Sequence, residues 1–112
     1  MPELCCTVRR IGDLESRTEE YEMSYGVEGA TPRRLRVKYQ AARAYEINAA
    51  LDAAVETART VISEAGPGLE SPTDEAISQF AWRTIQSAKY EGGRPLTSRL
   101  QLLLRGGESS AK

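Results

Sequence analysis

The stretch Ala41–Ala65, AARAYEINAALDAAVETARTVISEA, predicts a long helix and limits how the rest of the chain can pack. Nine of its 25 residues are alanine, the strongest helix former. A heptad pattern also runs through it, with Asn48, Val55 and Ile62 at a positions. Leu51 occupies a d position in the same pattern. A single polar a residue among β-branched ones, with Leu at d, is typical of a specified helix pair. We therefore predict that these four residues contact another helix, in this chain or in a partner.

Three runs that precede the helix alternate apolar and polar residues with a period of two. They span about 4–11, 20–27 and 34–39, and glycine and proline clusters separate them. This period is typical of strands with one buried face. The segment 13–20 is acidic and poor in apolar residues, so it is interpreted as an exposed loop or short helix. The expected fold class is α+β, with an antiparallel sheet at the N-terminus.

The third run has an alternative interpretation. Thr31 and Pro32 are suited to the start of a helix, which would then run over residues 33–65 and make the chain mostly α. Such a helix would place four cations of segment 33–38 at its N-terminus, where the helix dipole disfavours positive charge. We therefore favour a strand that ends near residue 39.

The second half of the chain predicts another helix and one ambiguous segment. Gly66-Pro67-Gly68 ends the long helix, and Ser71-Pro72-Thr73-Asp74 begins a helix that runs over about 73–90, so a helical hairpin is expected. Leucine spacing in 96–104 fits either a short helix or a strand. We expect 1–105 to be a single domain. Residues 106–112 form a polar tail, which we expect to be ordered only by contact with another chain.

Composition excludes several classes of site. The chain contains no histidine, so the commonest general base and zinc ligand is missing, and no phosphate-binding loop is present. Adjacent Cys5 and Cys6 are best interpreted as one thiol on each face of a strand. We expect no catalytic residue, cofactor or metal. With a net charge of −1, no apolar run of membrane-spanning length and no signal peptide, a cytoplasmic protein is expected.

Two aromatic residues lie off the apolar stripe of the second helix, namely Trp82 and Tyr90. Large side chains in such positions are frequent anchors in protein interfaces. Together with the heptad pattern, they favour a non-catalytic structural or assembly subunit. Such a subunit would act through contacts with itself or with other protein subunits, in a homo-oligomer or a larger particle.

A cluster of cations supports an alternative function. The cluster consists of Arg33, Arg34, Arg36, Lys38 and Arg43. A basic strand followed by a helix, a turn and a second helix is similar to the order of elements in ribbon-helix-helix repressors. That resemblance implies a dimeric DNA-binding regulator that uses strand 33–39 to contact nucleic acid. The resemblance covers about half of the chain, and the first helix is nearly twice the usual length.

Overall fold

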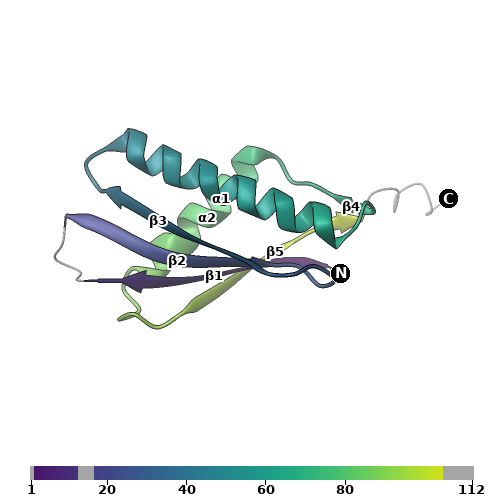
Figure 1. Cartoon of the computed structure of the whole chain (residues 1–112), viewed down its shortest axis with the longest axis horizontal. Coiled ribbons are helices and arrows are strands. Elements are labelled where there is room, and N and C mark those ends of the chain that lie inside the picture. Colours follow the sequence, from purple (N-terminus) through teal and green to yellow (C-terminus); the bar gives the residue numbers. More distant parts are fainter. Residues whose placement is uncertain (1, 13–16, 105–112) are drawn as a thin grey trace.

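The computed structural model describes residues 2–12 and 17–104, in which an antiparallel sheet is covered on one face by two helices (Figure 1). The elements, in chain order, are β1 Glu3–Ile11, β2 Thr18–Gly26, β3 Arg33–Gln40, α1 Ala44–Ala65, β4 Leu69–Glu70, α2 Asp74–Ala88, β5 Leu96–Gln101 and β6 Leu103–Leu104. The predicted α+β class is confirmed. Strands lead the chain, two helices follow, and a short strand segment comes last.

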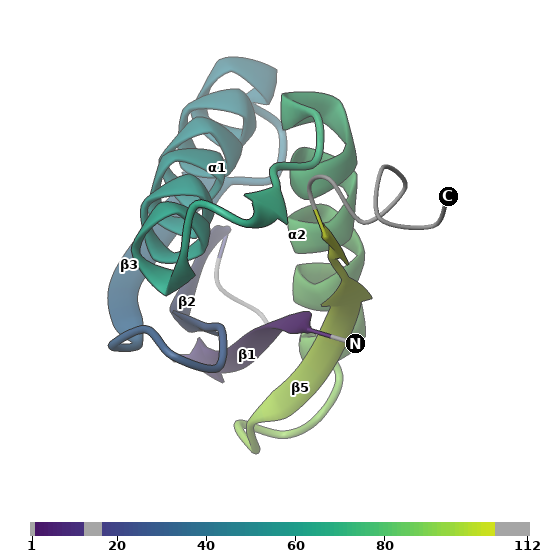
Figure 2. The same ribbon diagram turned by 90° about the vertical axis from the view of Figure 1, so that its right-hand side faces the viewer.

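The main sheet has the strand order β3-β2-β1-β5, with every neighbouring pair antiparallel. The last long strand therefore lies beside the first, and Cys6 is opposite Ser98. Strands β4 and β6 form a separate two-stranded ladder. Figure 2 shows both helices on the same side of the sheet, with α1 above β3 and α2 above β1 and β5. No helix of the described residues covers the opposite face of the sheet (Figure 2).

The core lies between the helices and the sheet. Alternate residues of the central strands are buried in it, as the period of two requires. The largest fully buried side chains of the sheet are Tyr21, Tyr25, Tyr39, Leu4 and Met23. The helices contribute Ala54, Ala58, Val61, Ile77 and Ile85, all buried. The buried alanines of α1 let this helix lie close to the sheet, which it contacts mainly at β3.

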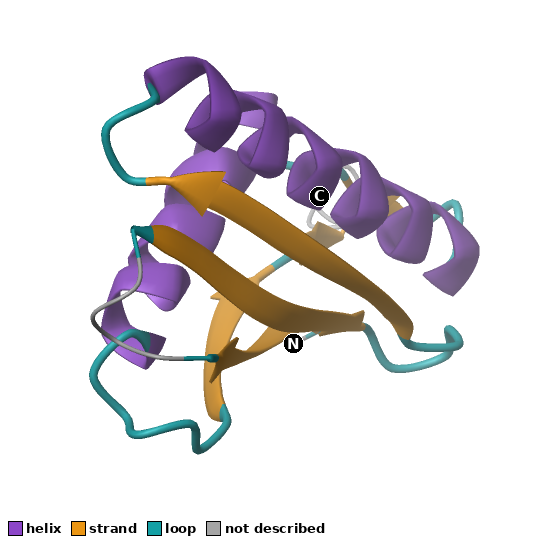
Figure 3. Cartoon of the chain, turned by 60° about the vertical axis from the view of Figure 1, so that its left-hand side comes forward, coloured by secondary structure: helices purple, strands orange, loops and turns teal. Residues whose placement is uncertain are grey.

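The alternative helix over 33–65 is wrong, because residues 33–40 form β3 (Figure 3). Helix α1 also begins three residues later than expected. The Arg43 backbone N–H donates to the Gln40 carbonyl (2.9 Å) and forms a turn over Ala41 and Ala42. The Gln40 N–H then donates to the Glu46 carboxylate (2.8 Å). This contact fixes the passage from strand to helix.

Two further segments refine the predictions. Strand β2 begins at Thr18, so the expected loop or short helix over 13–20 is wrong for its last three residues, and residues 13–16 lie outside the described part. Segment 96–104 forms β5 and β6, which decides between helix and strand. The predicted tail 106–112 also lies outside the described residues. Over residues 2–12 and 17–104, neither helix is long and apolar enough to cross a membrane.

Candidate interaction surfaces

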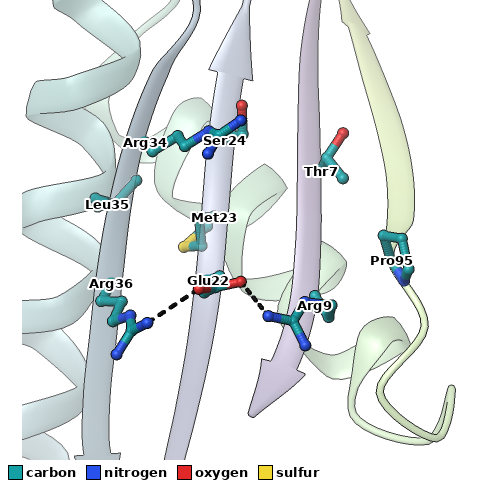
Figure 4. Close-up of a pocket in the computed structure, with 9 residues that line it drawn as sticks. All are labelled: Thr7, Arg9, Glu22, Met23, Ser24, Arg34, Leu35, Arg36 and Pro95. Atoms are coloured by element: carbon teal, nitrogen blue, oxygen red, sulfur yellow. Dashed lines mark hydrogen bonds and ion pairs between the residues drawn. The ribbon is translucent and has the colours of Figure 1, made fainter.

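The face of the sheet that the helices leave uncovered is polar, and its charged side chains pair across neighbouring strands. Glu22 of β2 lies between Arg9 of β1 and Arg36 of β3 and forms an ion pair with each (Figure 4). The hydrogen bond from Arg9, followed by that from Arg36, holds the pKa of the Glu22 carboxyl below its usual value. These residues border a shallow hollow of about 450 Å³, which Thr7 and Pro95 also line. The hollow has mixed charge and is not a closed pocket.

The predicted basic stripe is divided by the fold. Arg33 forms an ion pair with Glu64 near the end of α1 (2.6 Å). Arg43 forms one with Glu46 in the first turn of that helix (3.0 Å). Arg33 therefore links the start of β3 to the end of α1, and Arg43 links the turn after β3 to the start of α1. Three of the five predicted residues remain together.

The three that remain are exposed on the uncovered face of β3, namely Arg34, Arg36 and Lys38. Arg36 is also within 3.6 Å of Glu20, so two carboxylates neutralise it. Among the described residues, Arg34 and Lys38 form no ion pair. The positively charged surface that a phosphate could contact is therefore small, and it lies beside the carboxylates of Glu20 and Glu22 on β2.

The heptad residues predicted for α1 do not form one continuous surface that a partner could contact. Val55 and Ile62 are buried inside the chain's own core, while Asn48 is exposed and Leu51 is half-buried. The buried stripe includes Ala50, Ala54, Ala58 and Val61, and is rotated away from Asn48. The reason is that α1 packs on a broad sheet and beside α2. A helix on a sheet buries a wider stripe than the narrow a/d seam of a coiled coil.

The two aromatic residues of the second helical segment have different environments. Trp82 is half-buried, and its ring lies 6.0 Å from that of Tyr39 on β3. It therefore joins α2 to the sheet inside the chain. Tyr90 is 71% exposed, with the Lys89 ammonium 5.6 Å from its ring centre. Tyr90 alone of the pair presents most of its surface to a partner.

A surface that sequence reasoning did not identify runs along the outer edge of β5 and into β6; we call it the 96–104 edge. Strand β5 pairs with β1 on one side, and no described strand pairs with its other side. Leu96 and Leu100 are half-buried there, while Leu103 is 59% and Leu104 50% exposed. In the sequence, only the leucine spacing of this segment pointed to such a surface. The spacing fits a helix as well as a strand, so it identified no edge until the strand conformation was known.

A buried charged cluster was also missed. Glu19 is only 5% exposed and accepts hydrogen bonds from the Tyr21 hydroxyl (2.7 Å), the Tyr39 hydroxyl (3.2 Å) and the Lys89 ammonium (3.3 Å). Burial by itself raises the pKa of this carboxyl. The hydrogen bond from Tyr21, the charge of Lys89 and the bond from Tyr39 outweigh burial, so the pKa is lowered. The cluster ties β2, β3 and the end of α2 together.

The adjacent cysteines follow the sequence prediction. Cys6 is buried and Cys5 is partly exposed, on opposite faces of β1. Burial raises the pKa of the Cys6 thiol to about 11, although the neighbouring side chains of Tyr25 and Thr84 oppose the change. Cys6 therefore behaves as a core residue. Within the described ranges, no group of three or more Cys, Asp or Glu side chains is arranged to hold a metal ion.

Few of the surfaces predicted from the sequence remain available to a partner in the folded chain. Two of the four heptad residues of α1 lie inside the chain's own core, and the basic stripe is reduced to part of one strand. What remains is an edge with exposed leucines and a sheet face of mixed charge. Comparison of the chain with protein-family models, curated proteins and solved structures found no match.

Proposed function

We propose that the protein is a non-catalytic subunit that acts by binding protein chains, in a homo-oligomer or a larger particle. The observation that supports this function best is the 96–104 edge. An unpaired strand edge offers a row of backbone donors and acceptors, which is the template for adding another strand. Leu103 and Leu104, which pair with β4 in the small second ladder, place exposed apolar surface beyond the end of that row. We also propose a cytoplasmic location, because Cys5 and Cys6 are free thiols.

The two edges of the sheet differ in a way that favours this function. The opposite edge is β3, where three cations alternate along the exposed face. Charged side chains on an edge strand discourage the pairing of another strand. The exposed positions of β5 are Thr97, Arg99 and Gln101, with a single charge among them. Only the β5 edge is therefore open to a further strand without crowding charges of one sign.

The test of this proposal is the mass of the chain in solution, measured by light scattering over a range of concentrations. We expect an assembly larger than one chain. The paired substitution Leu103→Ser and Leu104→Ser should weaken it, because the exposed apolar surface is removed. A matched control is Tyr45→Ser, which removes an exposed aromatic at the start of α1, far from this edge in the sequence. A monomer at every concentration would contradict the proposed function.

A DNA-binding regulator is the second candidate, supported by the three cations on one face of β3. Phosphate contacts of this kind lose affinity steeply as salt rises. Replacing Arg34, Arg36 and Lys38 with Gln should flatten that dependence and leave the fold intact, because all three side chains are exposed. Titration of labelled duplex DNA with both proteins, from low salt upward, measures this dependence. If the unmodified protein does not bind DNA even at low salt, this candidate is excluded.

A further inference from the structure

We infer that a second copy of this chain pairs with β5 in antiparallel fashion, centred on Ser98, and joins two four-stranded sheets into one of eight strands. The inference rests on the proposed function and names the partner. The observation behind it is the sequence of β5, Leu96-Thr97-Ser98-Arg99-Leu100, in which two leucines lie at equal distances from the middle residue. A twofold axis through Ser98 relates each half of the strand to the other half in the partner.

The register about Ser98 creates complementary pairs on both faces. Leu96 lies opposite the partner's Leu100, and Thr97 lies opposite the partner's Arg99. Each pair occurs twice because of the symmetry. Residues directly opposite in an antiparallel pair share a face, with Cβ atoms about 5 Å apart. Leu96 and Leu100 already pack against the chain's own core on the helix-bearing side. Their remaining exposed surface would be covered by the partner's leucines.

Neighbouring registers are less favourable. A shift that centres the pair on Arg99 places two guanidinium groups directly opposite each other, which is destabilising. A shift that centres it on Thr97 pairs Leu96 with the partner's Ser98, so the leucines no longer meet. A shift that places the twofold axis between two residues pairs Leu96 with a residue such as the partner's Arg99. It turns the partner's helices to the other face of the joined sheet, so leucines lie beside exposed polar side chains. The register centred on Ser98 is the one that satisfies both faces.

Strand β3 is a less favourable site of self-pairing than β5, because its exposed side chains carry charge of one sign. Antiparallel pairings of β3 with its copy that keep the helices on one side and use most of the strand place cations opposite cations. A centre at Arg36 sets it against the partner's Arg36 and Arg34 against the partner's Lys38. Like charges directly opposite destabilise a pair of strands. A closed twofold dimer therefore forms through β5, which leaves both β3 strands as the outer edges of the larger sheet.

Charge at positions 97 and 99 tests the pairing and its register together. In Thr97→Arg, each new side chain faces the partner's Arg99, so we expect dimer dissociation to become about tenfold easier. Adding Arg99→Glu turns each contact into an opposite-charge pair and should restore the dimer. Both positions are exposed in the single chain, and the ion pair of Arg99 with Glu3 (3.7 Å) is also exposed, so its loss should cost little and the variants should fold. Lys38→Thr on β3 is the matched control and should leave the dimer unchanged.

The measurement is sedimentation equilibrium on all four proteins, with circular dichroism to confirm folding. Weakening by Thr97→Arg and recovery in the double variant support pairing about Ser98. An assembly that is indifferent to Thr97→Arg, or that the double variant does not restore, overturns the β5 pairing and leaves the proposed function standing. A wild-type chain that stays monomeric overturns both. The two failures are therefore distinguished by the mass of the unmodified protein.

Discussion

Replacing Glu19 with Gln tests whether the buried charged cluster stabilises the fold. The Glu19 Oε1 atom accepts both tyrosine hydroxyls, and Oε2 accepts from the Lys89 ammonium (3.3 Å). A glutamine keeps the volume and an oxygen for the tyrosines. It places an amide N–H₂ group, which is a donor, toward the ammonium. The substitution therefore removes the contact with Lys89 and the negative charge, and little else.

The size of the effect follows from burial. A hydrogen bond to a charged group contributes about 1.5–3 kcal/mol, and breaking a fully buried ion pair costs about 3–5 kcal/mol. The Lys89 side chain is 24% exposed, so water compensates part of its loss. We expect Glu19→Gln to lower the free energy of unfolding by about 2 kcal/mol at neutral pH. Urea unfolding followed by circular dichroism measures this.

The pH dependence gives the sharper test. Because the pKa of Glu19 is lowered in the folded state, its contribution is fully present above the pKa of the unfolded chain. That contribution is lost as the pH falls through the folded-state pKa. The difference in unfolding free energy between wild type and Glu19→Gln should therefore narrow as the pH falls below the pKa of a glutamate in the unfolded chain, about 4.3. Glu20→Gln is the control, because this residue lies on the opposite face and pairs, among the described residues, with the exposed Arg36; it should cost less than about 1 kcal/mol. A gap that is independent of pH, or equal to the control, would refute the role assigned to Glu19.

Two other predictions concern local features. The Thr73 hydroxyl caps α2 by accepting a hydrogen bond from the Ala76 backbone N–H (3.1 Å). Thr73→Ala should therefore lower the free energy of unfolding by about 1 kcal/mol, and Thr73→Ser should keep most of the stability. Equal stability of all three proteins in urea would contradict the cap. Because burial raises the pKa of Cys6 to about 11, a thiol reagent should modify Cys5 in the folded protein and Cys6 only after unfolding. Rapid modification of both thiols under native conditions, read by mass spectrometry, would show that the core is open at β1.

The N-terminal strands and both helices were predictable because their signals are local. The alternation around Met23 and Val37 records which side chains face the core, and Thr73 marks the start of α2. The environment of Glu19 was not predictable, since it depends on Lys89, which is 70 residues away in the chain. The exposure of Asn48 was missed for a similar reason. A heptad pattern fits a helix that packs on another helix, and this one packs mainly on a sheet.

The 96–104 edge shows a different limit. Its leucines fit two periodicities, and only the neighbouring β1 selects the strand. The side-chain hydroxyls of Thr7 and Thr97 are hydrogen-bonded at 2.8 Å across that pair. A hydrophobic pattern states that a segment has a buried side, but does not state which strand lies beside it. The lateral order of a sheet is set by contacts between distant segments.

The place of β5 beside β1 has a consequence for the kinetics of folding. Residues 90 positions apart must meet before the sheet is complete, and contacts of such long range slow folding. Until β5 docks, β1 is the edge of a three-stranded sheet, although it is an interior strand of the finished fold. During synthesis this edge stays exposed until residues 96–101 leave the ribosome. In that interval β1 is the segment most open to pairing with the wrong chain, and the docking of β5 ends the hazard.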